Sequence, residues 1–344
     1  MDIKSLYLDE LVIEMNKLDQ PAFRAKQIYE WIHKKLVSTY DDMTNLPKQL
    51  RNILNEHYPL TVLKAADSLV SEKDGTVKYL FRLNDDRVIE SVLMKYHHGN
   101  SVCISSQVGC RMGCTFCAST IGGKERDLTA SEMLDQIYRI QTISGERVSN
   151  VVVMGTGEPL DNYNNLVRFI RILSDSGGLN ISARNITVST CGIPDKIRVL
   201  ADEELPITLA LSLHAPNNEI RKKLMPIARQ YELSVVMEAV KYYYERTGRR
   251  LTFEYCLTEG INDEEEHAKE LSQLLKGYNC HVNLIPVNPI KERTFIKSNS
   301  NKIQKFKNIL EKYRINVTIR REMGSDINAA CGQLRKSHLD QSSK

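Results

Sequence analysis

Three cysteines stand close together in the stretch CRMGCTFC. They are Cys110, Cys114 and Cys117, and their spacing is C-x3-C-x2-C. Glycines beside two of them permit tight turns, so the three thiolates can converge. A cubane iron–sulfur cluster takes one ligand per iron, so three cysteines leave one iron open to bind and activate another molecule. A zinc site with a distant ligand such as His214, or ordinary buried cysteines, are the alternatives.

Polar residues also stand at the ends of later strand-like stretches. After VVVM comes the turn GTGEP, in which Gly157 leaves the backbone open and the carboxylate of Glu158 could hold an ammonium group. A single residue of this kind at a strand end commonly has only a structural role. Because such residues recur at several strand ends, we expect them to line one pocket. The other residues at strand ends are Ser189, Ser212, Leu213, His214 and Asn288.

The surrounding pattern shows which elements position these residues. From residue 101 onward strand-like stretches alternate with helical ones, which is typical of a parallel sheet or barrel. Thr129 and Glu132 form a possible capping box, so helices are predicted from about residues 129 and 162. The clustered cysteines therefore lie in the loop after the first strand, at the end where βα folds place active sites. The predicted strands are 101–106, 149–155, 184–190, 207–215, 251–257, 280–287 and 315–321.

The first 95 residues follow a different pattern. Residues 1–60 have helical periodicity, and 77–83 and 87–96 read as two strands joined by a turn at 84–86. We therefore expect a small helical and hairpin domain that ends near residue 95. Basic residues on its second helical stretch form either a solvated face or an RNA contact. These residues are Arg24, Lys26, Lys34 and Lys35.

Composition limits the class of protein. Of the 344 residues, 42% are hydrophobic and 26% charged, which is typical of a soluble globular protein. No apolar run approaches the roughly 18 to 20 residues of a membrane span, so we expect a cytoplasmic protein without a membrane partner. Eight cysteines in such a chain favour metal ligands, reactive thiols or buried side chains over a secreted disulfide framework. The net charge of +4 is too small to indicate an RNA partner by itself.

Motifs along almost the whole chain resemble one enzyme family. The cysteine stretch, with Phe116 before its last cysteine, is similar to the signature of radical S-adenosylmethionine enzymes. Several further stretches resemble the RlmN family of RNA adenine methyltransferases, whose near relative is the Cfr family. These stretches are VIES, CISSQVGCRMGCTFCAST, MGTGEPLDNY, STCGIPDKI, SLHAPNNEIRKKLMPI, HVNLIPVNP and GSDINAACGQL. The resemblance implies an α/β fold, an incomplete (βα)6-type barrel with a small N-terminal domain and a C-terminal extension. The expected divisions are 1–95, 96–322 and a catalytic loop and tail at 323–344.

The resemblance also implies cofactors and residue roles. The three clustered cysteines would hold a [4Fe-4S] cluster. Cys331 would carry a methyl group, Cys103 would resolve the resulting adduct by forming a disulfide with Cys331, and Glu90 would accept a proton. S-adenosylmethionine, used twice per turnover, would bind to Gly157, Glu158, Ser189, Ser212, Leu213, His214 and Asn288.

The implied activity is transfer of a one-carbon group to RNA. The family methylates carbon 2 of an adenine in the peptidyl-transferase region of 23S rRNA and of the adenosine 3′ of the tRNA anticodon. The expected partners are these RNAs and a reductant for the cluster and for the Cys103–Cys331 disulfide. The alternatives are Cfr-like methylation at carbon 8 and a zinc-stabilised RNA-binding protein without catalysis. Basic residues that flank Cys331 and would suit phosphates are Arg320, Arg321, Arg335 and Lys336, and the tail after them looks disordered.

Overall fold

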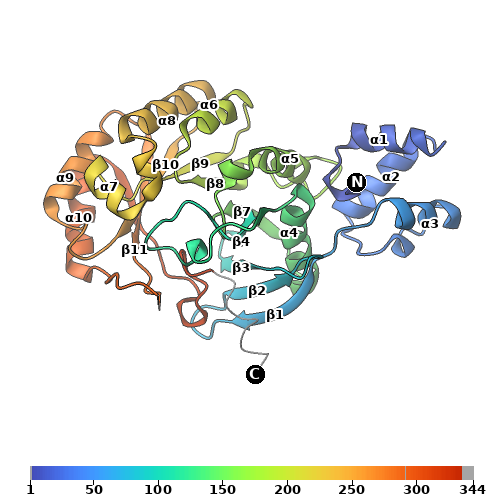
Figure 1. Ribbon diagram of the computed structural model, residues 1–344, viewed down its shortest axis with the longest axis horizontal. Coiled ribbons are helices and arrows are strands. Elements are labelled where there is room, and N and C mark those ends of the chain that lie inside the picture. Colours follow the sequence, from blue (N-terminus) through green and yellow to red (C-terminus); the bar gives the residue numbers. More distant parts are fainter. Residues whose placement is uncertain (1, 291, 335–344) are drawn as a thin grey trace.

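The computed structural model describes residues 2–290 and 292–334, which form a small helical lobe beside a larger barrel lobe (Figure 1). Residues Ala25, Ile28 and Ile32 are buried, so one face of the second helix packs inward at the spacing of a helical stripe. The prediction of helical structure in residues 1–60 is confirmed. The helices of the small lobe are α1 (Leu8–Lys17), α2 (Phe23–His33) and α3 (Lys48–His57).

Buried polar contacts fasten the small lobe to the first barrel helix, α4 (Ala130–Ser144). Lys4 forms an ion pair with Asp135, and both side chains are almost completely buried. Asp135 also accepts a hydrogen bond of 2.6 Å from the backbone of Leu63. Because a buried charge is stable only when it is paired, this ion pair fixes the position of the first residues of the small lobe against α4.

One sheet of ten strands runs through the described part of the chain. Its first four strands are antiparallel, and from the fourth strand onward every neighbouring pair is parallel. The two end strands are not paired with each other, so the barrel is open. In order across the sheet the strands are β1 (Lys64–Val70), β2 (Val77–Arg82), β3 (Val88–Tyr96), β4 (Gly99–Ile104), β7 (Val148–Val153), β8 (Ile186–Thr190), β9 (Thr208–Ser212), β10 (Leu251–Leu257), β11 (Cys280–Pro286) and β12 (Asn316–Ile319).

The predicted incomplete (βα)6-type barrel is confirmed. Each parallel strand from β4 to β11 is followed by at least one helix that packs outside the sheet, and β12 ends the series (Figure 1). The predicted capping box is also present, because Thr129 and Glu132 each bond the backbone of the other at the start of α4. The other barrel helices are α5 (Tyr163–Ser174), α6 (Pro194–Asp202), α7 (Asn218–Leu224), α8 (Leu233–Thr247), α9 (Glu265–Leu274) and α10 (Ser300–Lys312).

The predicted hairpin is present as β2 and β3, but it belongs to a larger antiparallel extension. The strand β1 was not predicted, because its residues are almost all exposed and show no apolar alternation. On the other side, β3 pairs with β4 from Val92↔Cys103 to Tyr96↔Gly99. The sheet therefore continues without interruption across the expected division at residue 95.

The barrel strand β10 is buried on both faces, whereas the last strand, β12, is partly exposed. Every residue of β10 is buried, as expected for a parallel strand with helices outside and loops or side chains inside. The loops that follow the carboxyl ends of these strands meet at one end of the barrel, where they can form a site. Among the described residues, no helix is long and apolar enough to cross a membrane.

Candidate active site

The loop of residues 109–125, here called the cluster loop, carries the three clustered cysteines. Its base is closed by antiparallel pairing of β5 (Gln107–Val108) with β6 (Arg126–Asp127). Gly109 has a φ of 75°, and a Cβ atom there would lie 1.9 Å from the carbonyl oxygen of Gly123. Only glycine fits at this position, because any side chain would collide with the returning backbone.

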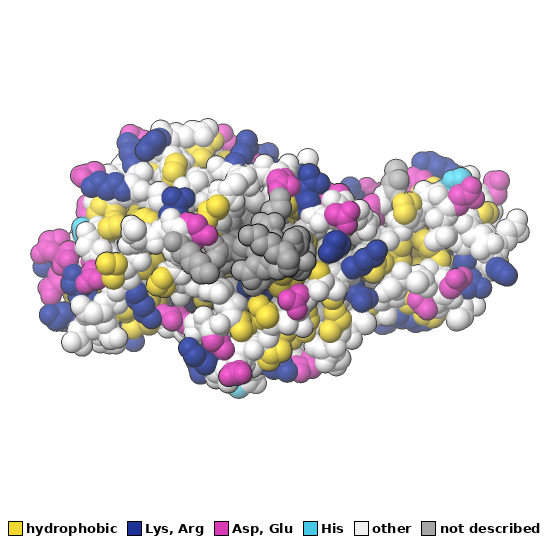
Figure 2. Space-filling view, turned by 60° about the horizontal axis from the view of Figure 1, so that its bottom comes forward, with side chains coloured by type: hydrophobic (Ala, Val, Ile, Leu, Met, Phe, Trp, Pro, Cys, Tyr) yellow, Lys and Arg dark blue, Asp and Glu magenta, His cyan; other side chains and the backbone are white. Residues whose placement is uncertain are grey.

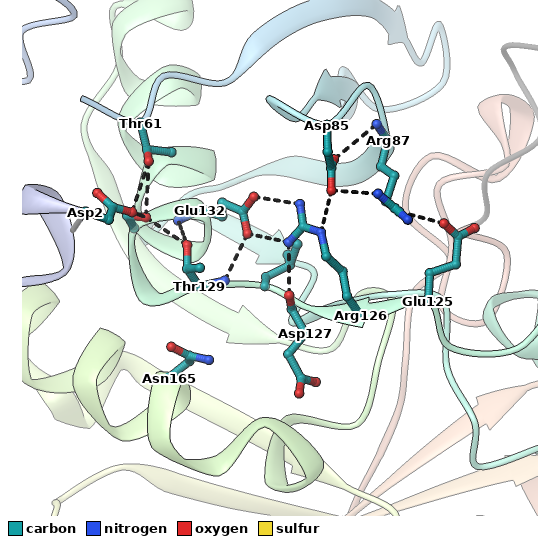
Figure 3. A network of polar contacts seen from close by, with 12 residues as sticks. Asp2, Thr61, Asp85, Arg87, Glu125, Arg126, Asp127, Thr129, Glu132 and Asn165 are labelled. Atoms are coloured by element: carbon teal, nitrogen blue, oxygen red, sulfur yellow. Dashed lines mark hydrogen bonds and ion pairs between the residues drawn. The ribbon is translucent and has the colours of Figure 1, made fainter. Parts of the chain in front are cut away.

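Charged residues hold the base of the cluster loop against the β2–β3 turn and against α4 (Figure 3). Arg126 makes two parallel hydrogen bonds of 2.8 Å to the carboxylate of Glu132, and its Nε donates to Asp85 at 2.6 Å. Arg87 donates to Asp85 at 2.8 Å and to Glu125 at 2.7 Å. The hydrogen bond from Arg126 is the largest cause that lowers the pKa of Asp85 to about 2. The network therefore keeps the Asp85 carboxylate charged and ties three segments together.

The three clustered cysteines line one cavity of about 1020 Å³ at the carboxyl ends of the barrel strands. Cys110 is buried, and Cys114 and Cys117 are half-buried. Burial raises the pKa of Cys110 to about 12 and also raises the pKa of Cys114 and of Cys117. These thiols keep their protons until a metal replaces them, as expected for ligands of a bound metal centre.

This donor set fits an iron–sulfur cluster better than a single zinc ion. Its three candidate ligands are all thiols on one loop that line the same cavity, and in a cubane cluster each thiolate binds a different iron. His214 is the example of a distant ligand in the zinc alternative, and its Nδ1 accepts a hydrogen bond of 2.9 Å from the backbone of Cys256. Burial lowers the pKa of His214 to about 3, so the ring is neutral and carries its proton on Nε2.

The predicted glycine turn after β7 lies on another wall of the same cavity. Gly157 has a φ of 114°, and a Cβ atom there would come within 2.7 Å of the side chain of Ser106. Glu158 is buried, and its two carboxylate oxygens accept from the backbone N–H groups of Leu160 at 3.0 Å and Cys191 at 2.7 Å. Burial raises the pKa of Glu158, and the hydrogen bonds oppose that shift. The turn thus presents a fixed carboxylate to the cavity.

The next strand ends supply small polar groups to this cavity. The hydroxyl oxygens of Ser189 and Ser212 are 3.2 Å apart, and both residues line the cavity. The His214 ring packs edge-on against Phe116 with their centroids 4.8 Å apart. Leu213 is buried but is not among the residues that line the cavity, and its backbone N–H donates to the carbonyl oxygen of Glu254. Of the residues predicted to bind S-adenosylmethionine, Leu213 alone does not reach the described lining of this cavity.

Residues 323–334, here called the Cys331 loop, fold over the mouth of the cavity. The Asn288 side chain donates to the carbonyl oxygen of Cys331 at 3.0 Å, so this predicted cofactor residue also holds the loop. From the cluster loop, Ala118 donates its backbone N–H to the carbonyl oxygen of Gly332 at 2.8 Å. The two cysteine-bearing loops are therefore in direct contact.

The opposite side of the Cys331 loop is attached to the β1–β2 hairpin. Ser71 donates from its hydroxyl to the carboxylate of Asp326 at 2.7 Å. Lys78 donates to the carbonyl oxygen of Asn328 at 3.3 Å. The antiparallel extension of the sheet thus forms a support for the loop that covers the barrel.

Cys331 stands where two cavities meet. It lines the cavity of the clustered cysteines, and it lines a second cavity of about 620 Å³ together with Cys103. Its side chain is accessible from the cavities, yet dense protein surroundings raise its pKa to about 11. Burial is the largest cause that raises the pKa of Cys103 to about 12, and the nearby thiol of Cys331 is the second. All eight cysteines are free in this structure, so the predicted disulfide is not formed in it.

Glu90 lies apart from these two cavities. It is buried on β3, and its carboxylate is 3.6 Å from the ammonium group of Lys78. It lines a third cavity of about 600 Å³, which shares the residue Ser119 with the cavity of the clustered cysteines. The structure therefore places Glu90 next to the predicted site but does not bring its side chain to Cys331.

Two charged residues in the site were not assigned a role there by the sequence. Glu254 on β10 lines the cavity, is buried, and lies 3.7 Å from Arg320. Arg320 lines both cavities, and although burial alone would lower its pKa, Glu254, Cys331 and Cys103 raise it. The sequence predicts Arg320 only as a phosphate contact, whereas strand register places it against Glu254.

The predicted basic residues are distributed over both lobes. Lys35 is exposed and lies 3.5 Å above the ring of Trp31, and Lys34 pairs with Glu30 at 3.7 Å. On the face in Figure 2, acidic and basic side chains are interspersed, with several basic ones where the small lobe joins the barrel. Arg321 is exposed. Outside the described residues lie Arg335, Lys336 and the tail 337–344.

Family models match two parts of the chain. Residues 104–271 match the radical SAM superfamily, and residues 1–60 match the ribosomal RNA large subunit methyltransferase N-terminal domain. The first match spans the cluster loop and most barrel strands, and the second spans the helical lobe. These matches confirm a radical S-adenosylmethionine enzyme, for which a [4Fe-4S] cluster and S-adenosylmethionine are implied.

Whole-length relatives agree with these matches. The chain is 66% identical to the probable dual-specificity RNA methyltransferase RlmN of Lachnoclostridium phytofermentans, over 99% of this chain and 96% of the relative. It is 61% identical to the protein of that name from Lachnospira eligens, over 98% and 97%. A radical SAM methyltransferase from Sphaerobacter thermophilus has a similar crystal structure, with 44% identity, a TM-score of 0.94 and coverage of 98% and 99%. The chain therefore belongs to the RlmN family of radical S-adenosylmethionine RNA methyltransferases.

Proposed function

We propose that this enzyme methylates carbon 2 of an adenine in the peptidyl-transferase region of 23S rRNA and of the adenosine 3′ of the tRNA anticodon. The observation that carries the proposal is the position of Cys331. It lines both the cavity of the clustered cysteines and the cavity of Cys103, as a carrier between two chemical steps would require. Relatives named dual-specificity RNA methyltransferase support the two RNA substrates.

The cavity of the clustered cysteines is proposed to bind both cofactors. Cys110, Cys114 and Cys117 would hold a [4Fe-4S] cluster, which when bound supplies the electron that cleaves S-adenosylmethionine to an adenosyl radical. The carboxylate of Glu158 suits the ammonium group of S-adenosylmethionine, and neutral His214 can donate from Nε2. Two molecules of S-adenosylmethionine would be used per turnover, one as methyl donor and one as radical source. The remaining proposed contacts are Gly157, Ser189, Ser212, Leu213 and Asn288.

Adenine carbon 2 requires a carrier because it is electron-poor and its hydrogen is not acidic. Cys331 would first accept a methyl group on sulfur, this group would then give a hydrogen atom to the adenosyl radical, and the carbon radical that remains would add to the ring. Glu90 would accept the ring proton, which requires movement because it lines a neighbouring cavity. The Cys103 thiolate would attack the sulfur of Cys331, the carbon–sulfur bond would break, and the released carbon would take up a proton to become the methyl group of the RNA. This leaves a disulfide and one surplus electron, which the bound cluster would be suited to take up. A cellular reductant would then restore both thiols.

RNA capture is proposed to involve both lobes. The three parts would be an RNA-binding N-terminal domain at 1–95, the barrel at 96–322, and the catalytic loop and tail at 323–344. Phosphates would contact the basic side chains, while the target base would leave its stack to reach the cavities. The match of residues 1–60 to a methyltransferase N-terminal domain supports an accessory role for the helices.

Two cysteine variants test the carrier mechanism. Cys331→Ala is expected to stop the reaction before any covalent species forms, because no thioether can be made. Cys103→Ala is expected to leave RNA attached to Cys331, because the attacking thiolate is missing. Labelled RNA is followed on a denaturing gel after an anaerobic reaction, and the adduct is mapped by mass spectrometry. Normal turnover by Cys103→Ala, or an adduct on another residue, would refute the mechanism.

The position of methylation is tested separately by mass spectrometry of digested 23S rRNA and tRNA. The product 2-methyladenosine in both RNAs supports the proposal. A product methylated at carbon 8 and confined to 23S rRNA would instead indicate the Cfr-like activity.

A further inference from the structure

A fully buried arginine lies beside the cluster loop. Arg221 on α7 is 0% exposed, and its Nη2 donates to the carbonyl oxygen of Cys191 at 2.6 Å. Its Nε and Nη1 atoms are also buried, and among the described residues they have no hydrogen-bond partner. A guanidinium with two unsatisfied donors is costly in a protein interior, so such a group calls for an explanation.

The groups around Arg221 are thiols and apolar side chains. The titratable groups that oppose the effect of burial on its pKa are Cys191 and Cys114. An arginine keeps its charge in proteins, so this site holds a positive charge facing sulfur. The apolar cluster that contains Cys110 and Cys191 and packs against Cys114 also contains Met112, Ala215, Ile220, Leu224 and Met225.

We propose that Arg221 is the buried counter-charge of the iron–sulfur cluster, placed on the side of Cys114, and that it raises the reduction potential of the cluster. This inference rests on the cluster assignment made above. With three thiolate ligands the cluster has a net negative charge, and reduction makes that charge larger. A nearby positive charge therefore stabilises the reduced form more than the oxidised form. The low dielectric of the apolar surroundings strengthens this effect.

The two unsatisfied donor atoms, Nε and Nη1, leave the charge of the guanidinium without hydrogen-bond compensation on that side. Arg221 does not line the cavity of the clustered cysteines, so its charge would act on the cluster across the Cys114 side rather than through a direct hydrogen bond. The bond to Cys191 alone would give Arg221 only a structural role. The two roles are separable, because glutamine can donate to that carbonyl oxygen without a charge, whereas lysine keeps the charge.

The test compares Arg221→Gln and Arg221→Lys with the wild-type holoenzyme. The reduction midpoint of the cluster is measured by an EPR-monitored redox titration without RNA, together with iron content and the rate of iron loss to a chelator. The matched control is Lys223→Gln on the same helix, where the lost charge is exposed and paired with Glu219 at 3.0 Å. Solvent screens such a charge, so the control should not change the midpoint.

We expect Arg221→Gln to lower the equilibrium constant for one-electron reduction at least tenfold, a negative shift of about 59 mV. Arg221→Lys should keep most of the wild-type midpoint. An unchanged midpoint in Arg221→Gln, or equal shifts in both variants, would overturn the proposal. If Arg221→Gln retains too little cluster for titration, iron loss decides: slower loss from Arg221→Lys supports the counter-charge, and equally fast loss from both refutes it.

These measurements are independent of the methyl-transfer steps. They use neither RNA nor the thiols of Cys331 and Cys103, so a failure of the carrier mechanism would leave the midpoints unaffected. A failure of the cluster assignment would be recognised differently, by wild-type protein that contains no iron and sulfide.

Discussion

The two loops that carry the reactive cysteines are attached to the barrel by different kinds of contact. The cluster loop is fastened by ion pairs at its base, where Arg126 bonds Glu132 and Asp85. Within the loop, Lys124 pairs with Asp161 at 2.8 Å. These ion pairs share partners, and the Arg126–Glu132 pair is bidentate. Their contributions to stability are therefore coupled rather than independent.

The Cys331 loop is attached through separate hydrogen bonds, several of them to its carbonyl oxygens and two to the carboxylate of Asp326. Asn288, Lys78 and Ala118 each donate one such bond. Single bonds of this kind contribute about 1 kcal/mol each, so the loop can be released in small steps. The comparison suggests a fixed platform for the cofactors and a movable carrier above it, which agrees with the several positions that Cys331 must reach in the proposed reaction.

The largest effect is expected when one of the proposed cluster ligands is removed. Cys114→Ala should abolish iron binding and reductive cleavage of S-adenosylmethionine, because one iron loses its ligand. Iron content and 5′-deoxyadenosine formation measure this. Cys280→Ala removes a buried thiol outside the site and should retain both. Full turnover by Cys114→Ala would show that the cluster loop does not hold the cofactor.

An intermediate effect is expected when the ion pairs at the base of the cluster loop are removed. Arg126→Gln should destabilise the cluster-free protein by about 1 to 3 kcal/mol, since it leaves charged partners partly buried. Thermal unfolding and the rate of iron loss to a chelator check this. Arg246→Gln, which breaks the exposed pairs with Asp202 and Glu204, should cost less than about 1 kcal/mol. Equal effects of the two changes would contradict the idea of a stiff base.

The smallest effect is expected at the movable carrier. Asn288→Ala removes one bond to the Cys331 carbonyl oxygen, so loop opening should become easier by about 1 kcal/mol, or roughly fivefold. Alkylation of Cys331 by iodoacetamide, in protein without cofactors, would rise by that factor with little change in thermal stability. Asn308→Ala, on the surface of α10, is the control. Unchanged alkylation would mean that the loop is not limited by this contact.

Much of the fold could be predicted from local pattern. Apolar periodicity and the capping pair Thr129 and Glu132 were sufficient for the alternating elements, and the cysteine spacing identified the loop at the end of β4. The strand β1 could not be predicted in this way, since an exposed edge strand is defined by the neighbour that it pairs with. Its attachment to the β2–β3 hairpin is a property of the folded sheet.

The structure brings together most site residues that the sequence predicts from motifs, whereas residues placed by strand register give no local signal. Glu254 lies opposite Ser212 on β9 and Asn283 on β11, so parallel pairing brings it to the cavity. In the sequence it is one glutamate in an apolar strand, which gave no reason to single it out. Arg221 gives no sequence signal either, because in a helix rich in basic residues only packing determines which side chain is buried.

The attachments of the Cys331 loop also bear on the order in which the molecule folds. Its bonds join residues far apart along the chain: Ser119 with Leu334, Lys78 with Asn328, and Ser71 with Asp326 at a separation of 255 positions. Contacts of such long range form late, because closing a long segment of chain costs entropy that only an existing surface can repay. During synthesis from the N-terminus, the hairpin and barrel would precede this loop. The thiol of Cys331, the proposed methyl carrier, would thus reach its place beside the cavities only after the rest of the enzyme has been assembled.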